Sequence, residues 1–105
     1  MGDHSLNDTA HLLCRHWGLN SEEFSSWESL RRALSLRLEA LLEDDFGALV
    51  NAMYRLDVAE AAFKQALNAG NAAEIATELT EIVLQREFQR LATRRKYQVH
   101  PNQSH

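Results

Sequence analysis

Apolar side chains recur along this chain at spacings of three and four, the pattern typical of amphipathic helices. The clearest run forms one stripe of a helix predicted from about Trp27 to Glu43. Its members are Trp27, Leu30, Leu34, Leu38 and Leu41. Four glycines, one proline and no strand-like alternation predict an all-α fold. We expect a compact bundle of about five helices, with a long helix at the C-terminus.

The first helix is predicted within LNDTAHLLCRHWGL, with Asn7 or Asp8 at its start and Gly18 as the left-handed residue after its end. Its apolar side would comprise Leu12, Leu13 and Trp17. The helix that follows would begin with a capping box formed by Ser25 and Glu28.

A third helix is predicted after Asp44 or Asp45, and we expect a sharp bend at Leu56–Asp57 before a fourth. Asp57 and Glu60 have the spacing of a capping box. A single straight helix over 46–68 is the alternative. The buried edge of the third helix would comprise Phe46, Leu49, Val50 and Met53.

The last helix is predicted from Ala72 to about Gln98, roughly 40 Å long. Asn71 and Glu74 form the capping box at its start, after Gly70 ends the preceding segment. Residues 99–105 are polar and include Pro101, so we predict a disordered tail after a single helical domain over 1–98.

The apolar residues of this last helix change sides along its length. Its first half places Ile75, Leu79 and Ile82 on one side, whereas Leu84, Phe88 and Leu91 point in nearly the opposite direction. Either the other helices of the chain cover both sides, or the second group packs on another protein or a second copy of the chain. Leu84, Phe88 and Leu91 are therefore the candidate protein-interaction residues.

Basic residues gather at the C-terminal end of an otherwise acidic chain, whose net charge is −4. They are Arg86, Arg90, Arg94, Arg95 and Lys96. One interpretation is a solvated helix face, with arginines paired to acids such as Glu43, Asp44 and Asp45. The other is a contact with an anion or a nucleic acid, in which Tyr97 stacks on a base.

No motif of catalysis or metal binding emerges from the sequence. His11 and Cys14 share a helix face, but a structural zinc site needs about four such ligands. Tyr54, Arg55 and Asp57 either form a site at the predicted bend or simply fix the junction. We expect no enzyme, no cofactor and no small-molecule substrate.

The location is expected to be the cytoplasm. Cys14 is the only cysteine, which favours a reducing compartment. The N-terminus lacks the basic and apolar regions of a secretory signal, and no apolar run approaches the length of a membrane helix.

The stretch LEALLEDDFGALVNAMYRLDVAEAAFKQAL, followed by QREFQRLATRRKY, resembles a family of short, uncharacterised bacterial helical proteins. The similarity spans about residues 30–97 and includes the acidic-aromatic helix start, the Tyr-Arg-Leu-Asp-Val bend and the basic final helix. It implies a compact bacterial helical domain and assigns no catalytic residue. The expected function is protein binding, with self-association through the last helix as one form of it and a nucleic-acid-associated regulator as the alternative.

Overall fold

The computed structural model describes the backbone of residues 2–19 and 24–103, and the side chains of residues 6–19 and 24–94. The described backbone forms five helices and confirms the predicted all-α fold with a long final helix. They are α1 (Gly2–Trp17), α2 (Trp27–Asp44), α3 (Phe46–Leu56), α4 (Glu60–Ala66) and α5 (Ala72–Gln103).

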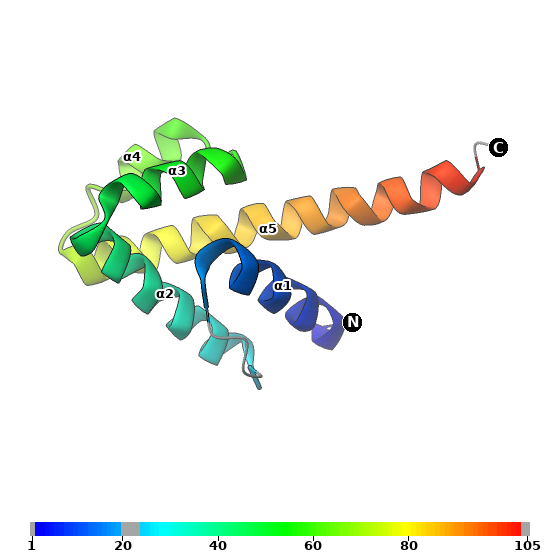
Figure 1. The fold of residues 1–105 in the computed structure, drawn as a ribbon, viewed down its shortest axis with the longest axis horizontal. Helices are drawn as coiled ribbons and strands as arrows, with labels where there is room; N and C mark the ends of the chain where they lie inside the picture. The colour runs from blue at the N-terminus through cyan, green and yellow to red at the C-terminus, as the bar shows by residue number, and fades with distance from the viewer. Residues whose placement is uncertain (1, 20–23, 104–105) are drawn as a thin grey trace.

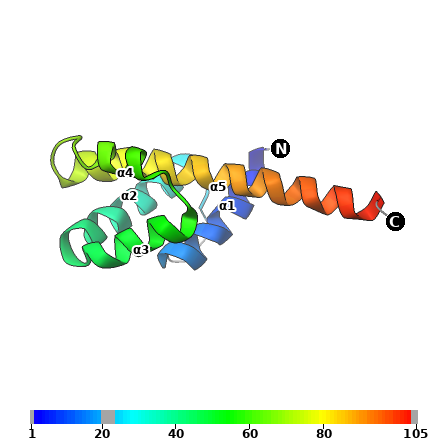
Figure 2. The same cartoon turned by 90° about the horizontal axis from the view of Figure 1, so that it is seen from above.

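Helix α5 is the axis of the bundle and contacts each of the other four helices. In Figure 1, α3 and α4 lie above α5, while α1 and α2 lie below it. The C-terminal end of α5 extends beyond the other helices in both views (Figures 1 and 2). Helices of the same chain therefore flank α5 on two sides, which explains why its apolar residues do not share one face.

The core lies where α1, α2 and α3 meet the first half of α5. The predicted leucine stripe of α2 is buried as expected, and Trp27 packs partly buried against its edge. Helix α5 adds Leu79, Val83 and Leu84 to the same cluster. Burial of these side chains removes enough apolar surface from water to hold the short helices in place.

Helix α1 begins at Gly2, earlier than the predicted start at Asn7 or Asp8. The prediction was wrong because both residues are compatible with a helix interior when tertiary packing supports it. Ala10 and Leu6 pack against the core about one and two turns before Leu13, respectively, so the apolar side extends further toward the N-terminus. The predicted apolar residues Leu12, Leu13 and Trp17 are all buried, and Gly18 has the expected left-handed backbone.

The first two capping predictions have different outcomes. Helix α2 begins as predicted at Trp27, but its capping box joins Ser26 and Ser29 rather than Ser25 and Glu28. The hydroxyl of Ser29 accepts from the N–H of Ser26, the role in the capping box that we had predicted for the carboxylate of Glu28. Asp45 caps α3 as expected, accepting from the N–H of Ala48 at 3.1 Å.

The chain bends at Asp57, which confirms two helices rather than one over residues 46–68. Asp57 does not cap α4, however. It adopts a left-handed backbone with φ of 66° and ends α3, so the predicted box with Glu60 does not form. Ala59 precedes α4 without a side-chain cap.

The buried side of α3 is rotated from the prediction. Leu49, Met53 and Leu56 are buried, whereas Phe46 is exposed and Val50 is only partly buried. The sharp bend explains this, because α4 folds back beside α3 and offers a second surface for these two side chains.

The capping box at the start of α5 forms as predicted. Asn71 accepts from the N–H of Glu74, and Glu74 accepts from the N–H of Asn71, both at 2.9 Å. The helix then continues to Gln103, so residues 99–103, predicted as part of a disordered tail, extend it. The last two residues of the predicted tail lie outside the described residues.

Among the described residues, no helix combines the length and the apolar character that crossing a membrane requires.

Candidate functional site

The three predicted interaction residues differ in how far each is exposed to solvent. Leu84 belongs to the core and is 1% exposed. Phe88 is 38% exposed and meets Trp27 edge-on, with ring centroids 5.4 Å apart. Leu91 is partly buried. In the folded chain a partner can therefore reach Phe88 and Leu91, but not Leu84.

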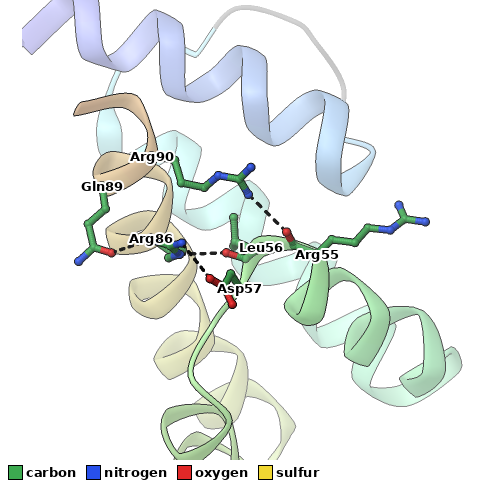
Figure 3. A network of polar contacts seen from close by, with 6 residues as sticks. All are labelled: Arg55, Leu56, Asp57, Arg86, Gln89 and Arg90. Atoms are coloured by element: carbon green, nitrogen blue, oxygen red, sulfur yellow. Dashed lines mark hydrogen bonds and ion pairs between the residues drawn. The ribbon is translucent and has the colours of Figure 1, made fainter. Parts of the chain in front are cut away.

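Two of the predicted basic residues, Arg86 and Arg90, donate hydrogen bonds to groups at the end of α3 (Figure 3). Arg86 donates to the carbonyl oxygen of Leu56 at 2.9 Å and to the carboxylate of Asp57 at 3.3 Å. Arg90 donates to the carbonyl oxygen of Arg55 at 3.4 Å. The last carbonyls of a helix lack partners within the helix, so these guanidinium groups satisfy them and offset their partial negative charge.

Arg86 therefore does not pair with Glu43, Asp44 or Asp45, as the first interpretation of the basic face had proposed. Its partner is Asp57, which the left-handed turn brings next to α5. The bend residues thus fix the junction, which was the plainer of the two interpretations. The side chain of Tyr54 is exposed, at 67% for the residue.

The remaining basic residues lie further along α5. Arg94 is exposed and borders a shallow depression of about 350 Å³ that it shares with Arg86, Arg90 and Thr93. The side chains of Arg95 and Lys96 lie outside the described residues. The structure therefore presents part of the predicted basic face to solvent, while Arg86 and Arg90 also have internal partners.

An apolar groove lies between α3 and α4, and the sequence did not predict it. Its volume is about 200 Å³, and Phe46 and Phe63 stack beside each other with centroids 6.4 Å apart. Its other apolar side chains are Val50, Met53, Tyr54, Val58 and Leu67. The only sequence signal was the excess of apolar residues on α3, which we assigned to a buried edge.

A run of three acidic residues precedes Phe46 of the groove along the sequence. Glu43 and Asp44 end α2, Asp45 lies between α2 and α3, and all three are exposed. On α4, Glu60 and Lys64 pair with each other at 3.5 Å, so their charges compensate locally. An apolar hollow of this kind fits the apolar side of an amphipathic helix.

A hydrogen bond between an exposed histidine and a buried glutamate joins α1 to α5. The Nδ1 atom of His16 lies 2.8 Å from the Oε2 atom of Glu87, whose side chain is fully buried. Among the described residues, the second oxygen of Glu87 has no hydrogen-bond partner. A carboxylate enclosed in this way is held by its one contact with His16.

The described residues contain no cluster of three or more side chains suited to hold a metal ion. Cys14 is half-buried.

Comparison of the chain with protein-family models, with curated proteins and with solved structures found no match in any of the three. The resemblance over residues 30–97 therefore stays a prediction.

Proposed function

We propose that this chain is a non-enzymatic helical protein that acts by binding protein, and that one partner is a second copy of itself. The end of α5 from one copy would lie in the groove between α3 and α4 of the next. We call residues 91–103 of α5 the arm, since the C-terminal end of α5 extends beyond the other helices (Figures 1 and 2). The observation that carries the proposal is the groove, an apolar hollow between α3 and α4 at which Phe46 is exposed.

The arm and the groove complement each other in chemistry. Leu91 and the neighbouring Phe88 offer apolar side chains, and Arg94 is exposed on the same helix. In sequence, Arg95 and Lys96 follow directly. Basic residues on the arm would meet Glu43 and Asp44, which end α2 just before Phe46, and opposite charges would favour encounter and fix orientation.

Exposed aromatic side chains give the association its driving force. Phe46 is 45% exposed at the groove and Tyr54 lies near it. Covering such a surface is worth about 25 cal/mol for each Å² of apolar area removed from water. Because groove and arm are different surfaces, the contact closes into a dimer by reciprocal exchange or continues into larger assemblies.

Light scattering over a range of protein concentrations tests the proposal. Leu91→Asp, Phe88→Asp and Phe46→Asp should each weaken self-association by about tenfold or more. Leu36→Asp is the matched control, because Leu36 is 62% exposed on α2 and lies outside both the groove and the arm. A chain that stays monomeric up to millimolar concentration would refute self-association.

Reversing the two charges distinguishes specific docking from non-specific association. Asp44→Arg and Arg94→Glu should each weaken association, and the chain with both changes should recover most of it. Neither residue caps a helix, since Asp45 performs that role for α3. If the double variant associates no better than the single variants, the proposed contact between these charges is wrong.

A nucleic-acid-associated regulator is the alternative, and the exposed Arg94 beside a depression bordered by arginines favours it. Phosphate contacts would then come from Arg94, Arg95 and Lys96, with Arg86 and Arg90 contributing beside their internal roles. Binding to DNA or RNA should weaken with added salt, and Arg94→Glu should lower the salt slope by about one. An absence of binding even at low salt would exclude this function.

The cytoplasm stays the proposed location, on the basis of the lone cysteine.

A further inference from the structure

A second cluster of basic side chains surrounds a pocket where the ends of α1 and α3 meet α5. The pocket has a volume of about 330 Å³. Its basic lining residues are Arg15, His16, Arg55 and Arg90. They come from three helices that are far apart in the sequence, so only the folded chain brings them together.

The three arginines of this pocket have no carboxylate partner among the described residues. Among the described residues, none that lines the pocket is a carboxylate, and no carboxylate pairs with Arg15, Arg55 or Arg90. Glu87 contacts His16 but does not line the pocket. Guanidinium groups gathered in this way repel one another, and an anion bound between them removes that cost.

Capping of the helix ends explains only part of the cluster. The last carbonyl of α1, on Trp17, accepts from Arg37 at 2.8 Å. The carbonyls at the end of α3 accept from Arg86 and Arg90, and Figure 3 shows the side chain of Arg55 extending away from these bonds. Arg15 and Arg55 are not used as caps, so their charges remain for another contact.

The apolar part of the lining indicates more than an inorganic ion. This part consists of Trp17, Ala52 and Leu56, and Trp17 is buried, with 3% exposure. The indole N–H of Trp17 has no acceptor among the described residues. A pocket of this volume lies at the small end of the range for organic ligands, about 300–1,000 Å³.

We infer that this pocket binds a small organic phosphate monoester, with the phosphate between Arg15, Arg55 and Arg90 and the organic part against Trp17 and Leu56. A phosphate carries close to two negative charges at neutral pH and presents several acceptor oxygens. The planar fork of arginine matches those oxygens with paired hydrogen bonds. This site is distinct from the arm and the groove, so it does not depend on self-association.

Titration of the protein with phenyl phosphate, inorganic phosphate and benzoate at constant ionic strength tests the inference. The readout is the indole N–H resonance of Trp17 in a nitrogen–proton correlation spectrum, assigned with a Trp27→Phe variant. Phenyl phosphate should shift this resonance saturably, with a dissociation constant at or below about 1 mM. Inorganic phosphate should bind more weakly because it lacks the apolar part, and benzoate because it carries one charge.

Arg15→Gln and Arg55→Gln should each weaken phenyl phosphate binding by about tenfold. Arg32→Gln is the matched control, since Arg32 is exposed on α2 and lies outside this pocket. Circular dichroism checks that each variant keeps its helices. The inference fails if Trp17 does not respond to phenyl phosphate, if Arg32→Gln weakens binding equally, or if benzoate binds as tightly as phenyl phosphate.

Discussion

Glu87 is an ionisable residue whose side chain is fully buried. Its carboxylate lies in the interior of a small helical bundle, on the side of α5 that faces α1, and His16 is its hydrogen-bond partner. A buried carboxylate costs free energy unless hydrogen bonds and charge compensate for it. The pair therefore specifies the position at which α1 crosses α5 more than it adds stability.

His16→Ala should lower the free energy of unfolding by about 1–3 kcal/mol, because Glu87 then has no partner in the interior. Adding Glu87→Leu should restore most of that loss, since an apolar side chain is compatible with the site. Urea denaturation followed by circular dichroism measures both. His11→Ala, an exposed change on the same helix, is the control and should have little effect. Equal stability of the His16→Ala and His11→Ala variants would contradict the structural role of the pair.

At the scale of the helices, the junctions depend on single residues with special backbone geometry. Gly70 has φ of 150° immediately before α5, a conformation that residues with a Cβ atom rarely adopt. A Cβ atom there would collide with the carboxylate of Glu74, which caps the N–H of Asn71. The start of the longest helix thus requires glycine.

Gly70→Ala should destabilise the protein by about 1–3 kcal/mol through backbone strain and loss of the cap. Gly47→Ala provides the comparison, since Gly47 lies inside α3, where a Cβ atom has ordinary contacts. That change should be neutral or stabilise by up to about 1 kcal/mol. Thermal denaturation should therefore give a lower midpoint for Gly70→Ala and an unchanged or higher midpoint for Gly47→Ala. A lower midpoint for both variants would argue against this explanation.

The sequence was sufficient for elements governed by local rules. The leucine stripe of α2 and the capping box of Asn71 and Glu74 follow from spacing alone, and both were predicted. Asp57 was misassigned because aspartate suits both a helix start and a left-handed turn, and only the packing of Arg86 against it decides between them. The early start of α1 likewise depends on its contact with the core.

At the scale of the molecule, α5 organises both candidate surfaces. Arg86 and Arg90 anchor the end of α3 to α5, and this junction holds the α3–α4 pair beside it. Positions 15, 55 and 90 meet at one pocket only because three helix ends converge there. The spacing of residues within a helix could not have predicted this pocket, nor the groove that forms when α4 folds back on α3.

Arg86→Ala should therefore affect the orientation of α3 and α4 as well as the contacts of Arg86 itself. It removes the partner of the Leu56 carbonyl and of Asp57, and should cost about 1–2 kcal/mol of stability. The resonances of the groove residues should also shift, because the junction that orients α3 and α4 is loosened. Arg31→Ala is the control, since Arg31 pairs with Glu81 at an exposed site. Groove resonances that stay unchanged in Arg86→Ala would show that the junction is held by apolar packing alone.

The order of the helices, with α5 after α1 to α4, has a consequence for how the protein is made. Leu79, Val83 and Leu84 complete the core, yet the ribosome adds them after all the helices that they cover. Until then α1 to α4 are short segments with their apolar sides in water, and helices of such length are marginal alone. Folding must therefore follow the synthesis of α5, and a nascent chain that stops at residue 71 should remain open to chaperones and proteases.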